Sequence, residues 1–167
     1  MRYFQKISLN EFGKHFSNDK LYDDIKLPNR STVKSAGYDF YAIDDYELKP
    51  GESIVVPTGV KVCLEENEFL GIYVRSSMGF KYNIRLCNQV GIIDSDYYNN
   101  VDNEGHILVK IQNEGDKIYK INKGDKFCQG IIQKYYITSD DLVTKNRTSG
   151  IGSTGNWVWH VYIIMIE

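Results

Sequence analysis

An arginine followed by two serines, Arg75-Ser76-Ser77, has the side chains to bind an anion. A guanidinium pairs bidentately with phosphate oxygens, while the hydroxyls and the N–H groups of a beginning helical turn add further donors. A surface arginine followed by a serine helix cap has the same sequence. The three residues therefore indicate a phosphate site only in combination with other stretches.

A second stretch, from Asn88 to Tyr97, could bind a base and activate a water. An apolar strand passes through Gly91 and leads to Asp94 and Asp96, which strand alternation places on one face. Backbone groups of such a hairpin could hold a base edge. A carboxylate within reach of a water could act as a general base.

Two glycine-containing stretches could complete a ligand site. Residues 35–40 read SAGYDF, in which a glycine turn precedes Asp39 at the start of an apolar strand. An aspartate in that place is usually a turn cap. Residues 147–155 read RTSGIGSTG, where alternating glycines allow close approach to a ligand and hydroxyls add uncharged donors. A disordered linker has the same composition.

The composition is that of one globular domain without a polyanionic partner. The 167 residues are 42% apolar and 25% charged, which favours one domain with a real core. The 20 basic and 22 acidic residues leave a net charge of −2, and no block of like charge occurs. A binder of nucleic-acid backbone is not indicated, so any bound anion must meet a local site.

The cysteines and histidines do not have the spacing of a metal site. They are Cys63, Cys87, Cys128, His15, His106 and His160. Without a CxxC or paired histidines, buried free thiols and no zinc are expected. The start of the chain lacks signal-peptide features, and no segment approaches the ~20 apolar residues of a membrane span. A cytoplasmic protein is expected.

Most of the chain is expected to form strands. Tyrosine is abundant, with 13 residues, and turn signals recur at the spacing of about 8–12 residues typical of a sandwich or barrel. The expected strands are Ser53–Pro57, Glu68–Val74, Ile84–Cys87, Ile107–Ile111, Lys117–Ile121 and Phe127–Tyr136. Helix is expected only near Leu9–Phe16 and Ser77–Lys81, because elsewhere the apolar spacing is two.

Taken in order, SAGYDF, YVRSSMG, NQVGIIDSDYYN, GDKFCQG and RTSGIGSTG resemble the five motifs of trimeric dUTPases, between about residues 27 and 155. The resemblance implies an all-β, jelly-roll-like distorted barrel that forms a homotrimer with sites shared between subunits. It implies hydrolysis of dUTP to dUMP and pyrophosphate with Mg²⁺. Residues 1–155 would form the domain, with 145–155 as a lid, and residues 156–167 an apolar extension of unknown role.

The resemblance also implies a role for each matching residue. Asp39 would orient waters on a Mg²⁺ ion held by the phosphates, Asp94 would activate the attacking water, and Tyr97 would pack on the deoxyribose. The substrate-binding residues implied are Arg75, Ser76, Ser77 and Gln129 for phosphate, Asn88, Gly91 and Ile93 for uracil, Tyr97 for the sugar, and Arg147, Ile151, Gly152, Ser153 and Thr154 for the lid.

Some features leave alternatives open. Ile151 stands where most members carry a phenylalanine that stacks on uracil. Ile92 and Ile93, beside Asp94, are expected to exclude solvent from that carboxylate in part. A dCTP deaminase shares the fold and an RSS-type motif but would need an acid/base group beside the cytosine amine. A regulatory protein-binding role is a further alternative, for which the apolar tail is the one hint.

Overall fold

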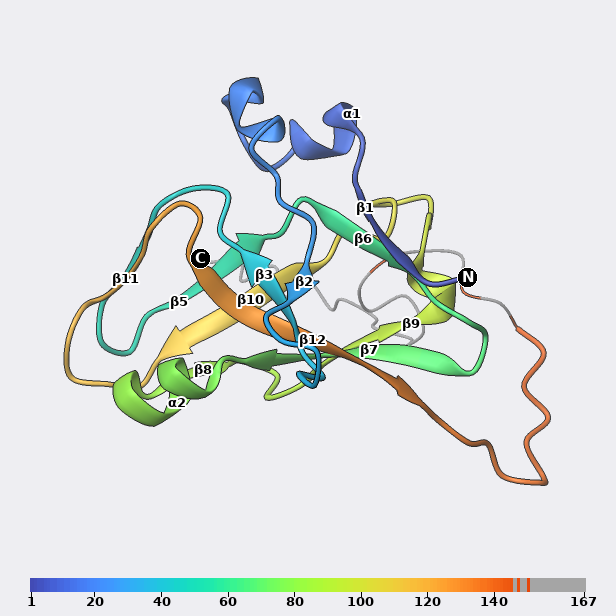
Figure 1. Ribbon diagram of the computed structural model, residues 1–167. Helices are drawn as coiled ribbons and strands as arrows, with labels where there is room; N and C mark the ends of the chain where they lie inside the picture. The colour runs from blue at the N-terminus through green and yellow to red at the C-terminus, as the bar shows by residue number, and fades with distance from the viewer. Residues whose placement is uncertain (146, 148–149, 151–167) are drawn as a thin grey trace, which may run out of the picture.

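Strands make up most of the ordered elements in the computed structural model, which describes residues 1–145, 147 and 150 (Figure 1). In chain order the elements are β1 (Tyr3–Lys6), α1 (Leu9–Phe12), η1 (Asp19–Tyr22), β2 (Asn29–Arg30), β3 (Tyr38–Tyr41), β4 (Tyr46–Leu48), β5 (Ser53–Pro57), β6 (Val60–Cys63), β7 (Glu68–Val74), α2 (Ser76–Tyr82), β8 (Ile84–Leu86), β9 (Gly91–Asp94), η2 (Ser95–Tyr97), β10 (Leu108–Asn113), β11 (Tyr119–Ile121) and β12 (Lys126–Lys134). The prediction of an all-β protein is confirmed.

The largest sheet carries most of the predicted site residues. Its strand order is β2-β3-β12-β7-β9, and each paired strand is antiparallel to its neighbour. Figure 1 shows β12 crossing the molecule between β3 and β7, with α2 following one end of β7. The smaller sheets are β5-β10-β8, β1-β6 and β11-β4.

Strand alternation divides the large sheet into a buried apolar face and a face of mixed polarity. Phe40, Leu70, Ile72 and Cys128 point to one face and are at most 2% exposed. Burying a side chain of this size stabilises the fold by about 1.5–3 kcal/mol. The opposite face carries the neighbours in sequence, including Asp39.

The predicted elements form with shifted ends. Ser53–Pro57 and Glu68–Val74 agree with β5 and β7, whereas the other four expected strands differ by one to two residues at one or both ends. One local expectation is wrong: strand β9 stops at Asp94, and residues 95–97 form a 3₁₀ turn. Alternation along a strand therefore does not relate Asp94 to Asp96.

The three cysteines are free, but only Cys128 is buried; Cys63 and Cys87 are partly exposed, contrary to the expectation of three buried thiols. Within residues 1–145, 147 and 150, the model contains no helix long and apolar enough to cross a membrane.

Candidate functional site

A basin with two cationic side chains lies where β7 ends and α2 begins. Its cavity of about 440 Å³ is lined in part by Arg75, Ser77, Tyr119 and Lys126. Arg75 is the N-cap residue of α2 and has an extended backbone, so the exposed hydroxyls of Ser76 and Ser77 follow it directly in the first helical turn. The predicted anion-binding triplet is thus placed at the edge of a cavity.

Asp39 is the buried acid of this basin. Its side chain is only 9% exposed, and its carboxylate forms ion pairs with Lys126 Nζ at 2.8 Å and Arg75 Nε at 3.2 Å. Ser31 Oγ donates a third contact at 2.7 Å. Burial by itself would raise the pKa of Asp39, but the hydrogen bonds from Lys126 and Ser31 and the charge of Arg75 outweigh it, so the pKa is lowered. Asp39 is therefore ionised at neutral pH.

Gln129 lies beside Asp39 because β12 pairs with β3 at these two residues. Its Nε2 donates to the Val74 carbonyl at 3.2 Å. A Cβ atom at Gly37 would lie 2.4 Å from Gln129 Oε1, so the glycine of the first motif makes room for the amide. A glycine suits this position because the Gln129 side chain closely approaches the main chain at residue 37.

Lys126 and Ser31 are functional candidates that the motif reasoning did not single out. Lys126 and Gln129 are three residues apart, which on a regular strand places them on opposite faces. A register shift between Lys126 and Cys128 turns both side chains toward the face of Asp39. The lysine stands inside GDKFCQG, but no sequence signal marks the bulge.

The predicted base-binding hairpin forms a second, separate cavity. Its volume is about 140 Å³, and its lining includes Asn88, Gly91, Ile93 and Leu108. A Cβ atom at Gly91 would lie 3.2 Å from Ile72 Cβ and 3.7 Å from Asn88 Nδ2, within the space that the cavity occupies. The slot therefore combines apolar walls with backbone groups and one amide.

Asp94 stands at the rim of the hairpin and is bound by Arg147. Arg147 Nη2 lies 2.9 Å from Asp94 Oδ2, and Arg147 Nε lies 3.2 Å from Asp96 Oδ1. The arginine therefore bridges the two acids, although they do not lie on one strand. The Asp94 side chain is 46% exposed, and Ile92 is 54% exposed. Within one chain, solvent is thus excluded from Asp94 only in part, and of the two neighbouring isoleucines Ile93 is half-buried.

Tyr97 is held rigidly beneath the same arginine. Its hydroxyl donates to the His106 carbonyl at 3.2 Å and accepts from Asn103 Nδ2 at 2.7 Å. The Arg147 guanidinium lies 5.6 Å from the ring centroid. Burial, the largest effect, raises the pKa of Tyr97, so the phenol is neutral. Its fixed ring could limit what fits beside the hairpin.

The basin and the hairpin lie far apart on the large sheet. Asp39, Gln129 and Tyr73 are paired across β3, β12 and β7, whereas Asp94 of β9 pairs with Phe69. With strands ~4.8 Å and residues ~3.3 Å apart, the two acids are separated by roughly 14 Å across the sheet and roughly 13 Å along it. The cross-strand pairing places them on the same face, opposite the apolar core.

The other residues predicted to form a lid, Ile151, Gly152, Ser153 and Thr154, lie outside the described residues, as does the predicted 156–167 extension. Gly150 is described, and its N–H donates to Asp102 Oδ2 at 2.7 Å.

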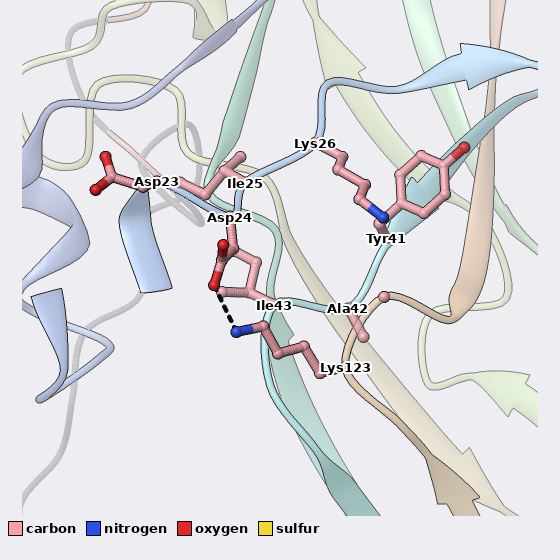
Figure 2. A pocket seen from close by; sticks show the side chains of 9 residues that line it. Asp23, Asp24, Ile25, Lys26, Tyr41, Ala42, Ile43 and Lys123 are labelled. Atoms are coloured by element: carbon pink, nitrogen blue, oxygen red, sulfur yellow. Dashed lines mark hydrogen bonds and ion pairs between the residues drawn. The ribbon is translucent and has the colours of Figure 1, made fainter. Parts of the chain in front are cut away.

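A larger cavity of about 550 Å³ adjoins the basin and shares Tyr41 with it. Figure 2 shows that its two lysines are engaged: Lys123 pairs with Asp24, and Lys26 extends over the Tyr41 ring. Arg75 and Lys126 of the smaller basin are likewise paired, with Asp39, but its wall also carries Ser77 of the predicted anion-binding triplet.

Comparison with known proteins agrees with the motifs. The dUTPase family model matches residues 23–155. A deoxyuridine 5'-triphosphate nucleotidohydrolase of Lactococcus lactis is 42% identical over 133 residues, which cover 78% of this chain and 89% of the relative. The crystal structure of dUTPase from Streptococcus mutans is 34% identical with a TM-score of 0.67, covering 81% of this chain and 98% of that one.

A more distant structure shares the fold. A mutant dUTPase from phage phi11 of S. aureus is 19% identical with a TM-score of 0.65, covering 87% of this chain and 97% of that one. That structure reveals the coordination of a structural Mg(II) ion.

Proposed function

The chain belongs to the dUTPase family and hydrolyses dUTP to dUMP and pyrophosphate, and we propose that its basin binds the triphosphate while the hairpin binds the nucleoside. The observation that carries this assignment is the buried, ionised Asp39 between Lys126 and Arg75, beside two exposed serine hydroxyls. A triphosphate needs cations and uncharged donors together, and phosphoryl transfer requires mainly positioning and charge stabilisation. The basin supplies both kinds of donor.

The donor set of the basin fits Mg²⁺ bound through water. Asp39 is an ionised carboxylate and Gln129 an amide, which are the hard oxygen donors that this ion prefers, and Mg²⁺ keeps several of its waters. Ser31, Arg75 and Lys126 already contact the carboxylate, so it would hold the ion's waters and not the ion itself. The ion would supply neutralisation of phosphate charge.

The hairpin has the features to select uracil and deoxyribose. The Asn88 amide and the main chain near Gly91 and Ile93 line a slot suited to a base edge. Tyr97, fixed by His106 and Asn103, would pack on the deoxyribose and leave no room for a 2′-hydroxyl. Selectivity would then depend on the position of one ring.

Asp94 is the residue we assign as general base for the water that attacks the α-phosphorus. Its exposed carboxylate can reach a water, but Arg147 occupies one of its oxygens. The other oxygen stays open to a water, and departure of Arg147 would free the whole carboxylate. In this proposal Arg147 moves to the phosphates when Ile151, Gly152, Ser153 and Thr154 close over the nucleotide.

The separation of the two half-sites supports a homotrimer with shared sites. A base acts within hydrogen-bond distance of its water or through one further water, a shorter reach than the sheet distance between Asp94 and Asp39. Between them the outer face carries the half-buried Phe69, Tyr73 and Ile131. A neighbouring subunit packed on this face would bring its hairpin to this basin. In a cyclic trimer the same contact occurs at each of the three interfaces, which would give three shared sites.

The decisive experiment is pyrophosphate release from dUTP, dTTP, dCTP and UTP, with and without Mg²⁺. We expect Mg²⁺-stimulated release from dUTP far above the other three nucleotides. Ammonia release from dCTP would instead support the deaminase alternative. We propose that the enzyme is cytoplasmic. After cell fractionation, the same assay should then detect the activity in the cytoplasmic fraction.

A further inference from the structure

The N-terminal helix α1 lies outside the matched residues 23–155, yet it contacts the loop that follows Tyr97. Three side chains in and beside this helix reach residues 98–106, hereafter the 98–106 loop. Ser8 donates to the Glu104 carboxylate, Glu11 faces His106, and Lys14 Nζ donates to the Asp102 carbonyl at 3.2 Å. The helix and its flanking residues thus contact three positions of this loop, Asp102, Glu104 and His106.

The central contact, between Glu11 and His106, is fully buried. The two residues are 1% and 0% exposed. The Gly59 N–H donates to His106 Nε2 at 2.9 Å, so in the neutral ring the proton is on Nδ1. Burial and the neighbouring His15 lower the pKa of His106 to about 4, so the ring is neutral at physiological pH.

His106 presents a protonated nitrogen, and not a metal ligand, toward Glu11. Glu11, His15 and His106 hold ligand atoms within 4.8 Å of one another, which the sequence spacing did not predict. His106 Nδ1 has no free electron pair, however, because it carries the ring proton. It lies 3.6 Å from Glu11 Oε1, too far for a hydrogen bond but near enough for the charge of the carboxylate to act on it. Glu11 also contacts Lys14 Nζ at 2.6 Å and His15 Nε2 at 3.4 Å.

The main chain of His106 connects this buried pair to the sugar side of the site. Its carbonyl accepts the Tyr97 hydroxyl, and its N–H donates to the Asn103 carbonyl at 2.8 Å. The Asn103 side chain in turn donates to the Tyr97 hydroxyl. A displacement of His106 therefore moves both hydrogen-bond partners of the ring.

The 98–106 loop needs such support because its backbone is strained. Asn99 and Glu104 have φ values of 56° and 59°, in the left-handed region. Gly105 has a φ of 82°, and a Cβ atom there would lie 2.7 Å from the Tyr97 carbonyl oxygen. Conformations of this kind persist only where surrounding structure holds them.

We propose that Glu11 and His106 are positioning residues for Tyr97, so that helix α1 sets the preference for deoxyribose over ribose. The inference rests on the proposed role of Tyr97 in the function above. It assigns a role in sugar selection to a helix that reaches Tyr97 through the 98–106 loop.

The test compares Glu11→Met, which removes the acceptor facing His106, with Glu11→Gln, which keeps an acceptor. The readout is the ratio of kcat/KM for dUTP to that for UTP. Because misplacing a positioning group by about 1 Å costs up to about a hundredfold, we expect the ratio to fall about tenfold in Glu11→Met. Glu11→Gln should restore most of it. Glu47→Gln, which alters an exposed pair with Lys120, is the control.

Should Glu11→Met fail to fold, His106→Gln addresses the same contact, since it keeps an acceptor for Gly59 but removes the imidazole Nδ1–H that faces Glu11. Tyr97→Ala is the reference. An unchanged ratio in Tyr97→Ala overturns the sugar role and the inference with it. A changed ratio there with an unchanged ratio in folded Glu11→Met or His106→Gln overturns the inference alone, even if the melting temperature falls.

Discussion

Asp39 and Asp94 are both aspartates that pair with an arginine, but they differ in burial and in the number of their partners. The side chain of Asp39 is 9% exposed and has three partners on the framework of the sheet, whereas Asp94 is 46% exposed and is held by Arg147. A buried charge requires compensation, and on the Asp94 side only the arginine is largely buried, at 13% exposed. Asp39 is therefore fixed by its partners on three sides, whereas the exposed part of the Asp94 carboxylate is open to a water.

The largest effect should come from the acid that is free to change partners. We expect Asp94→Asn to leave folding and dUTP binding nearly intact while lowering kcat at least about a hundredfold, the scale of losing a general base. Pyrophosphate release and calorimetric titration of dUTP measure the two quantities. A variant that keeps its turnover would refute the assignment of Asp94 as the base.

Sharing of sites tests whether the two acids meet across subunits. Neither Asp94→Asn nor a chain truncated before Arg147 should be active alone. After co-refolding, some mixed trimers would combine an intact hairpin with an intact lid at one site, so we expect activity to recover in part.

The control for this experiment is each variant refolded by itself and then mixed without unfolding. Light scattering establishes the assembly state of all samples. A stable monomer, or no recovery after co-refolding, would show that each site lies within one subunit.

The sequence predicted the motifs better than their geometry. Arg75 could be named from the chemistry of phosphate binding, whereas Asp39 was indicated by the order of the motifs, through their resemblance to dUTPases. Lys126 could not be found, since the β12 bulge that turns it toward Asp39 leaves no local signal. The Glu11–His106 contact is between residues 95 positions apart, so only the packing of α1 on the 98–106 loop brings them together.

Asp39→Asn should show its effect in stability as well as activity. The pKa of Asp39 is lowered in the fold, so ionisation stabilises the protein above its ordinary pKa of 3.8, and that contribution is lost as pH falls through the lower folded value. At neutral pH we expect a loss of about 1–3 kcal/mol in the free energy of unfolding, because a charged buried acceptor is removed.

Urea unfolding between about pH 7 and about pH 3 measures this difference, which should shrink toward the acid end of the range. Glu47→Gln provides the exposed counterpart and should be near neutral throughout. A difference that stays constant or grows on acidification would contradict the ionised state of Asp39.

The smallest expected effect concerns Ile151, for which the resemblance to dUTPases implies a position otherwise held by a phenylalanine that covers uracil. Base stacking on an aromatic side chain contributes about 1–3 kcal/mol, whereas a branched aliphatic offers apolar contact without a flat π-face. Since isoleucine keeps part of that contact, we expect Ile151→Phe to raise kcat/KM for dUTP about threefold to tenfold. Closure of the lid, and not the chemical step, would improve.

The gain should accordingly disappear in a chain that also carries Ser153→Ala and Thr154→Ala, because those hydroxyls are proposed to hold the lid to the phosphates. Steady-state kinetics of the single, double and triple variants separate the two contributions. If Ile151→Phe is neutral or harmful in the otherwise intact enzyme, another aromatic residue must cover the base. Trp157 and Trp159 are the nearest candidates in sequence, and alanine at each would then lower kcat/KM in its turn.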